Sequence, residues 1–441
     1  MRQFSTKLLK RAISAWGNRL PTIWRNPSKL VSANRFDIPA KVIYAKNFFR
    51  GTEEGWPTDL YLAHINSFNG FFEKEPAKNC EGDFLNEFNT LLRSVVEQGF
   101  DTAVSTIPIG WSDLNFPING AHRIAAGISL SKNVPCRLIE SDDQHVWNYS
   151  YFLNRGLHED YADAIALEFV DLSRSTRAYI VYDHLRNDLD LVEKVIASLG
   201  KVVYRKRISM AKNAQTEFIR ILYSDEKWVG VKANGFQGAQ EKAEKCFEKG
   251  DSVTLFLVEP FDKESMLSGK NELRKIAKCG KHSVHSSDTW KETIRISESL
   301  LSQNSRDSLG QRKYASTPRF DSFVELLVRR AKADGVSLGD ICLSGSTTLA
   351  ALGLRDCNDI DYVGTSNTPE KFGGMFHKHT SETRYYRYSF DQIVQDPRLH
   401  FRYQGLKICA PAVIASMKKR RSEPKDISDL DLLQSVGIEC Y

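Results

Sequence analysis

The stretch of sequence that decides the fold reads L-S-G-S-T-T-L at residues 343–349 and N-D-I-D-Y-V at residues 358–363. Apolar residues lead into the first part, and apolar residues alternate with the aspartates of the second part. This pattern predicts strands at residues 338–343 and 358–363, joined by a short helix. Residues 320–334 carry apolar side chains at helical spacing, so a longer helix is expected before the first strand.

The residue types in this stretch are those that bind a nucleotide with a metal ion. Gly345 and Ser346, at the start of the short helix, offer bare backbone amides and a hydroxyl to phosphate groups. Asp359 and Asp361 are two residues apart, so on a strand both carboxylates point to one face. Such a pair suits a Mg²⁺ ion that bridges nucleotide oxygens. The sequence therefore predicts a Mg²⁺–nucleotide site with Asp359 and Asp361 as metal ligands.

The order of these elements resembles the polymerase-β-like nucleotidyltransferase superfamily, in particular its branch of abortive-infection toxins. A later segment, M-K-K-R-R-S-E-P-K-D-I-S-D-L at residues 417–430, resembles the lysine-rich late helix of that branch. The resemblance covers residues 318–436. It implies Mg²⁺, a nucleoside triphosphate such as ATP or CTP, and nucleotide contacts from Lys418 and Lys425.

Active members of this superfamily add a third carboxylate from a later strand. The expected strand, residues 400–408, contains no acidic residue, and only Asp391 and Asp396 lie nearby in the sequence. The C-terminal region is therefore either an active nucleotidyltransferase or a nucleotide-binding relic with a regulatory role.

A second pattern lies in the middle of the chain, where strand-like and helix-like segments alternate. His285 precedes S-S-D-T at the start of an amphipathic helix, a position where free backbone amides and the helix dipole favour an incoming phosphoryl group. Strands are expected at residues 178–182, 202–208 and 252–258, and helices at residues 189–199, 241–248 and 290–301.

This middle region resembles nucleoside diphosphate kinase, in which a histidine before such a motif is transiently phosphorylated. The resemblance implies a ferredoxin-like domain with His285 as the phosphoryl acceptor, Ser287 beside it and Arg274 as a phosphate-binding residue. Two positions depart from the family, because Tyr182 or Asp183 replaces a lysine and Ile296 replaces the glutamate that orients the histidine.

The departures leave other interpretations of the middle region open. Glu292 lies one turn before Ile296 and carries the carboxylate that Ile296 lacks. His282 and His285 lie three residues apart, so a metal pair is conceivable, although no third ligand is evident. A scaffold whose motif only caps a helix remains the alternative.

The N-terminal region carries a third pattern, with a helix at residues 84–98, strands at residues 103–109 and 135–139, and a helix at residues 124–130. The turn before the last helix reads N-G-A-H-R at residues 119–123. A glycine, a basic residue and a helix start form a plausible anion site.

This order resembles the ParB/sulfiredoxin-like fold over residues 58–140. The resemblance implies phosphate contacts from Gly120, His122 and Arg123, and Glu73 as the base of a kinase-like site. The alternative is a scaffold in which His122 and Arg123 only begin a helix.

Composition limits the class of protein and its location. The 441 residues are 41% hydrophobic and 26% charged, with a net charge of +6, which is ordinary for a globular protein of several domains. None of the eight cysteines forms a C-x-x-C pair, so reduced thiols and a cytoplasmic location are expected. Residues 1–36 are basic, and residues 4–16 have the spacing of an amphipathic helix. Such a helix can lie on the surface of a membrane through residues 1–20, or it can dock on its own domain. It also resembles an organelle transit peptide.

The sequence thus predicts an α/β and α+β multidomain protein. The expected parts are a basic segment at residues 1–36, a ParB/sulfiredoxin-like domain at 37–165, a nucleoside-diphosphate-kinase-like domain at 175–305 and a nucleotidyltransferase-like domain at 318–441. A polar linker is expected at residues 302–310. The predicted function is nucleotide-dependent phosphoryl or nucleotidyl transfer to a small metabolite or sugar. The alternative is a nucleotide-sensing or RNA-modifying, toxin-like regulatory protein with degenerate catalytic domains.

Overall fold

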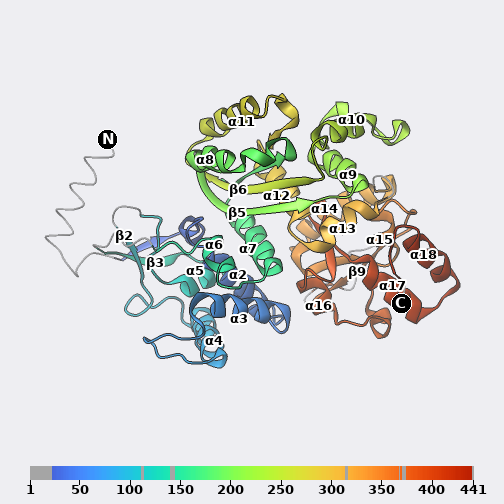
Figure 1. Cartoon of the computed structure of the whole chain (residues 1–441). Coiled ribbons are helices and arrows are strands. Elements are labelled where there is room, and N and C mark those ends of the chain that lie inside the picture. Colours follow the sequence, from blue (N-terminus) through green and yellow to red (C-terminus); the bar gives the residue numbers. More distant parts are fainter. Residues whose placement is uncertain are drawn as a thin grey trace. The chain divides into compact units, whose positions relative to one another are not determined.

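The computed structural model describes residues 22–110, 114–139, 145–312, 316–366, 368–369 and 374–439. Helices are combined with small sheets throughout these residues, which confirms the mixed α/β class. The chain divides after Ser175 into two compact units, described separately below (Figure 1). The predicted helix at residues 4–16, and with it the predicted membrane contact, lies outside the described residues.

The first unit is built on a three-stranded sheet with β3 (Val134–Ile139) in the centre. β1 (Ile23–Arg25) pairs antiparallel with β3, and β2 (Ile107–Gly110) pairs parallel with it. Helices supply the rest of this unit, namely η2 (Pro27–Leu30), α2 (Asp37–Phe48), α3 (Trp56–Asn69), α4 (Glu81–Glu97), α5 (Ala121–Ser129), α6 (Tyr149–Leu153) and α7 (Glu159–Leu172).

The strand predicted at residues 103–109 is wrong in its first half, because β2 begins only at Ile107. The side chain of Asp101 accepts a hydrogen bond from the amide of Ala103, and its carbonyl accepts one from the amide of Ser105. These bonds close a turn that competes with an extended strand. Hydrophobicity alone did not reveal that turn.

The second unit begins with a four-stranded antiparallel sheet in the order β5-β6-β4-β7. The strands are β4 (Arg177–Tyr182), β5 (Gly200–Ser209), β6 (Ser252–Pro260) and β7 (Val284–Ser286). α8 (Leu189–Leu199) and α11 (Lys263–Ala277) pack together on one face of this sheet, as Figure 1 shows. Alternate residues of β4 point to the two faces and are buried on both, so both faces of the sheet are covered.

A helical insertion separates β5 from β6. It contains α9 (Lys212–Leu222), η4 (Lys227–Val229), η5 (Lys232–Asn234) and α10 (Gln237–Cys246). α12 (Trp290–Leu300) follows β7 and begins at Thr289, whose side chain accepts a hydrogen bond from the amide of Glu292. This capping bond explains why the helix starts directly after the histidine motif.

The same unit continues into a five-stranded sheet in the order β10-β9-β8-β12-β11. Its strands are β8 (Ile341–Ser344), β9 (Ile360–Gly364), β10 (Phe376–Lys378), β11 (His400–Tyr403) and β12 (Leu406–Cys409). The helices are α14 (Pro318–Ala333), η7 (Leu338–Asp340), α15 (Ser346–Ala351), η8 (Thr380–Tyr385), α16 (Phe390–Gln395), α17 (Pro411–Arg421) and α18 (Pro424–Gln434). Ile393, Ile414 and Leu433 belong to the apolar core of this part.

Four predicted segments of the second unit also differ from the structure. The strand predicted at residues 338–343 begins only at Ile341, because residues 338–340 form η7. Residues 302–310 are not a loop, because Ser302 caps α13 (Gln303–Gln311), which buries Ser305 and Leu309. The strand predicted at residues 400–408 is a hairpin, since Gln404 and Gly405 both adopt positive φ and reverse the chain. The helix predicted at residues 417–430 is two helices, because Ser422 is left-handed and Pro424 begins α18.

None of the helices in the described part of the chain is both long enough and apolar enough to cross a membrane.

Candidate functional site

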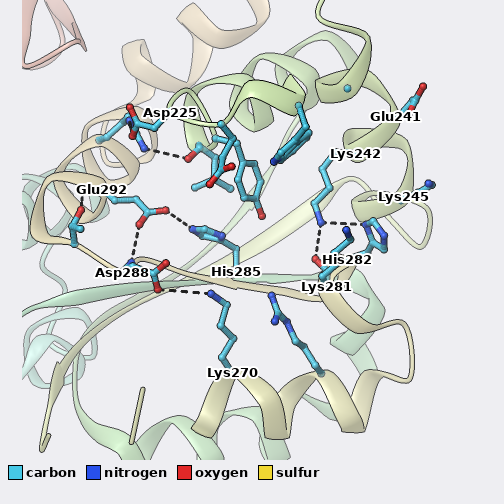
Figure 2. Close-up of a pocket in the computed structure, with 18 residues that line it drawn as sticks. Asp225, Glu241, Lys242, Lys245, Lys270, Lys281, His282, His285, Asp288 and Glu292 are labelled. Carbon is cyan, nitrogen blue, oxygen red and sulfur yellow. Dashed lines mark hydrogen bonds and ion pairs between the residues drawn. The ribbon is translucent and has the colours of Figure 1, made fainter. Parts of the chain in front are cut away.

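A cavity with a volume of about 690 Å³ opens beside β7 in the second unit (Figure 2). Its walls come from the insertion between β5 and β6 and from α11 and α12. Charged side chains dominate the lining, which includes four residues that the sequence singled out, namely Arg274, His282, His285 and Glu292. The other residues used below are Tyr223, Trp228, Lys242, Lys270, Lys281 and Asp288.

His285 lies at the middle of β7, opposite Ile180 of β4, and only 8% of its side chain is exposed. Its Nε2 is 2.8 Å from Oε1 of Glu292, while Oε2 of Glu292 accepts a hydrogen bond of 2.7 Å from the amide of Asp288. Burial lowers the pKa of His285, although the hydrogen bond that the ring donates to Glu292 opposes that shift. The ring is therefore neutral at pH 7, with its proton on Nε2 and a lone pair on Nδ1.

Two cations of α11 lie one helical turn apart in the cavity wall. Figure 2 shows Lys270 extending from α11 towards Asp288, and the two charged groups are 3.9 Å apart. Burial lowers the pKa of Lys270, and Asp288 opposes that shift. Nε of Arg274 is buried without a hydrogen-bond partner among the described residues. A buried, unpartnered guanidinium donor is costly unless a ligand or water accepts it.

A third cation enters the cavity from α10. Nζ of Lys242 donates to the carbonyl of Lys281 at 2.6 Å and lies 3.2 Å from Nδ1 of His282. Burial and the surrounding lysines lower the pKa of His282 to about 4, so its neutral ring accepts this contact. Burial also lowers the pKa of Lys242. Lys242, Lys270 and Arg274 thus place positive charge in a partly desolvated cavity.

Aromatic side chains complete one wall of the cavity. The ring centroids of Tyr223 and Trp228 are 5.0 Å apart, and Tyr223 also meets the ring of His285 edge-on at 5.0 Å. Trp228 is 44% exposed, which is unusual for so large an apolar side chain. The cavity therefore combines an exposed planar surface with buried cations.

The structure brings His285 and Arg274 to the same cavity but not Ser287. The hydroxyl of Ser287 is buried, accepts from the amide of Ala178 at 2.9 Å and contacts the hydroxyl of Thr293 at 2.8 Å. It joins β4 to α12 and does not line the cavity. The side chain that holds His285 is Glu292, one turn earlier than the family position at Ile296.

Sequence reasoning did not find Lys242, Lys270 or Trp228. Lys270 is four residues before Arg274, so both lie on one face of a helix, and this spacing was a usable signal. Lys242 and Trp228 belong to the insertion, which carries no motif. Only the folded chain brings them to His285.

The predicted Mg²⁺–nucleotide residues form a second candidate site at the end of β8. Gly345 has a φ of +60°, and a Cβ atom at this position would lie 2.6 Å from Oδ2 of Asp361. Asp361 lies in β9, and Asp359 directly precedes that strand. Burial raises the pKa of Asp359, and the charge of Asp361 adds to that rise. The two carboxylates are thus close enough to repel each other, as expected for a pair that shares a cation.

Lys418 and Lys425 do not contact Asp359 or Asp361 in the described structure. Lys418 is buried, with Nζ 3.0 Å from Asp426 and 2.6 Å from Asp429. Lys425 is exposed and pairs with a neighbouring glutamate. The ammonium of Lys418 therefore belongs to a buried ion cluster with two carboxylates, and its expected nucleotide contact stays a prediction.

The residues of the N-terminal turn that were expected to contact phosphate have hydrogen-bond partners inside the protein. The amide of Gly120 donates to the side chain of Asn119, and a guanidinium nitrogen of Arg123 donates to the carbonyl of Thr106 at 2.6 Å. Nε2 of His122 is 3.0 Å from the hydroxyl of Tyr61, and burial holds the pKa of His122 well below its usual range. An uncharged His122 adds no positive charge for phosphate.

Glu73, the expected base of the N-terminal site, forms an ion pair of 2.8 Å with Lys78. Gly120, His122, Arg123 and Glu73 therefore all have partners inside the first unit.

Within the described residues, no group of three or more His, Cys, Asp or Glu side chains is arranged to hold a metal ion. A metal at His282 and His285 would therefore lack a third protein ligand there. The aspartate pair needs fewer protein ligands, because Mg²⁺ binds through one or two carboxylates together with substrate phosphates and water. Asp359 and Asp361 fit that pattern.

No protein-family model, no curated protein and no solved structure matches this chain.

Proposed function

We propose that the cavity beside β7 binds the phosphate groups of a nucleotide and that His285 carries a phosphoryl group between two substrates. The contact between His285 and Glu292 is the observation that supports this function best. It engages Nε2 and leaves the lone pair of Nδ1 for a phosphorus atom. A histidine that served only as a helix cap would not need a cavity beside it.

The strand order supports the same proposal. β4, α8, β5, β6, α11 and β7 follow one another in the sheet order β5-β6-β4-β7, which is the arrangement of a ferredoxin-like domain. That domain is the one implied by the resemblance to nucleoside diphosphate kinase. The observed strand order agrees with the domain that the resemblance implies, and hydrophobic patterns alone did not predict that order.

The proposed transfer begins when Nδ1 of His285 attacks the terminal phosphorus of a nucleoside triphosphate. The N–P bond forms as the bond to the leaving nucleoside diphosphate breaks, and the ring gains positive charge. Glu292 stabilises that charge through the proton on Nε2, while Lys270, Arg274 and Lys242 offset the charge of the phosphate oxygens. An oxygen of a hydroxyl or phosphate acceptor then attacks the phosphorus of the phosphohistidine. The O–P bond forms as the N–P bond breaks, the electron pair returns to Nδ1 of neutral His285, and the proton of a hydroxyl acceptor passes to solvent. A small metabolite or sugar is the proposed acceptor.

Labelling with γ-³²P-ATP tests this function on the full chain. We expect an acid-labile, base-stable label that is absent from His285→Asn. The matched control is His282→Asn, since His282 lines the same cavity but its Nδ1 faces Lys242. A label that survives in His285→Asn would exclude His285 as the carrier, and a label lost in both variants would indicate a general loss of binding.

The aspartate pair favours a second activity, nucleotidyl transfer from a Mg²⁺-bound nucleoside triphosphate. Asp359 and Asp361 would hold the ion, and the backbone at Gly345 and Ser346 would approach the phosphates. When bound, the Mg²⁺ ion would neutralise phosphate charge and align the reacting groups. The test is formation of labelled product from α-labelled ATP or CTP with a metabolite extract, lost in Asp361→Asn. Turnover that requires RNA would favour the alternative, an RNA-modifying regulatory protein, with affinity that falls steeply with salt.

A further inference from the structure

The strand beside Asp361 is not the one expected from the sequence. β12 pairs with β8 on the side away from β9, so residues 400–408 do not adjoin the aspartates. β9 lies between β8 and β10, and the residue of β10 opposite Asp361 is His377. His379 follows directly after β10. Histidines therefore stand beside Asp361 where a third carboxylate was expected.

His379 begins a buried chain of polar contacts that ends at β8. Its Nε2 is 3.1 Å from Oδ2 of Asp361, and its Nδ1 is 2.8 Å from the hydroxyl of Tyr386. The same hydroxyl makes a short hydrogen bond with Ser344, the last residue of β8. His379, Tyr386 and Ser344 are all buried.

All of these contacts can be satisfied at the same time. Ser344 can donate to the oxygen of Tyr386, whose O–H donates to Nδ1 of His379. Nε2 then carries the ring proton and directs it at Asp361. The His379 ring contacts one carboxylate oxygen of Asp361, Oδ2, and leaves Oδ1 for another partner.

The backbone of Gly345 closes the other side of this arrangement. A Cβ atom at Gly345 would lie 2.6 Å from Oδ2 of Asp361 and 3.1 Å from Cε1 of His379. The amide of Asp361 also donates to the hydroxyl of Thr347 at 3.3 Å. Asp361 is thus confined by β10, by the Gly345 turn and by α15.

We propose that His379, supported by Tyr386 and Ser344, is the positioning residue that fixes the carboxylate of Asp361 for a divalent cation. This inference rests on the proposed Mg²⁺–nucleotide function of the aspartate pair. His379 takes the place of the third carboxylate, but it acts by orienting Asp361 through Oδ2. Partners of this kind around metal-binding carboxylates commonly change metal affinity by roughly 10- to 100-fold when removed.

The test is binding of Mn²⁺, with a non-hydrolysable ATP analogue, followed by electron paramagnetic resonance on the full chain. The Mn²⁺ binding that is lost in Asp361→Asn is assigned to this site. His379→Leu should weaken that binding by roughly 10- to 100-fold. His379→Gln, which keeps a donor towards Asp361, should restore most of the affinity, and Tyr386→Phe should weaken binding less than His379→Leu. Thermal unfolding of each variant reports any loss of fold.

The outcomes separate the two ideas. If Asp361→Asn abolishes binding but folded His379→Leu binds Mn²⁺ as well as the parent protein, the positioning role is wrong and the metal site stands. Weakening in His379→Gln as large as in His379→Leu would also overturn the positioning role, because it would mean that the imidazole itself is required. If Asp361→Asn changes no Mn²⁺ binding, the metal site is wrong and the inference falls with it.

Discussion

Glu292 holds His285 with one carboxylate oxygen and the backbone of its own helix start with the other. Oε1 lies 2.8 Å from Nε2 of His285, and Oε2 accepts from the amide of Asp288 at 2.7 Å. The first turn of α12 therefore sets the orientation of the ring. This geometry links the cap of a helix to the chemistry proposed for a strand residue.

Glu292→Gln should slow formation of phosphohistidine without abolishing the fold. A glutamine can still accept from Nε2, but it cannot balance the positive charge that develops on the ring. A hydrogen bond to a charged group contributes about 1.5–3 kcal/mol, which corresponds to a rate lower by about 10- to 100-fold. Rapid-quench labelling measures this rate. Glu298→Gln, on the same helix but paired with Arg402, is the matched control and should label normally.

The pH dependence of labelling should reflect the lowered pKa of the buried His285. Nucleophilic attack needs the neutral ring, and burial lowers the pKa of His285 below its ordinary value of 6.5. The rate of labelling should therefore fall with decreasing pH, and its midpoint should lie below pH 6.5. A rate that already halves near pH 7 would indicate that Glu292 raises the pKa in the folded protein more than burial lowers it.

Arg274→Met should weaken nucleotide binding, whereas the same change at the neighbouring Lys275 should not. The buried Nε of Arg274 has no partner among the described residues, so a phosphate oxygen would satisfy a donor that is otherwise costly. Loss of a charge-assisted bond of about 1.5–3 kcal/mol predicts an affinity lower by about 10- to 100-fold in calorimetry. Lys275→Met removes the same charge from an exposed position and is the control. Equal affinities of the two variants would exclude a direct contact from Arg274.

The fold class was predictable because it depends on local patterns, whereas the sites depend on contacts between distant segments. Apolar periodicity located α8, β6 and α14 to within a few residues. The S-S-D-T motif pointed to His285, and an i, i+4 spacing on α11 would have pointed to Lys270. Lys242 reaches the cavity from an insertion that only the tertiary structure places there. His379 was missed because the order of the strands put β10, and not residues 400–408, beside Asp361.

Gly345→Ala should destabilise the protein through backbone strain and should also disrupt the second site. Gly345 has φ +60° and ψ −133°, a backbone conformation that costs an alanine roughly 1–3 kcal/mol. At Gly345 a new methyl group would also displace Oδ2 of Asp361. Gly335→Ala also places an alanine at positive φ, +66°, but nothing lies within 4 Å of the new Cβ. We expect both variants to lose stability in chemical denaturation, and only Gly345→Ala to lose Asp361-dependent Mn²⁺ binding.

Lys418→Met should destabilise the C-terminal part of the chain, although the sequence pointed to this lysine as a nucleotide ligand. Its side chain is 2% exposed and pairs with both Asp426 and Asp429, so the substitution leaves two buried carboxylates with less compensation. Breaking a buried ion pair from one side costs about 3–5 kcal/mol. Lys425→Met is the control, because Lys425 is 65% exposed in an ion pair that contributes little. Chemical denaturation followed by circular dichroism should show a large loss for the first variant and almost none for the second. If Lys418→Met unfolds like the parent protein yet loses nucleotide affinity, the buried cluster is not its main role, and the lysine contacts nucleotide in another conformation.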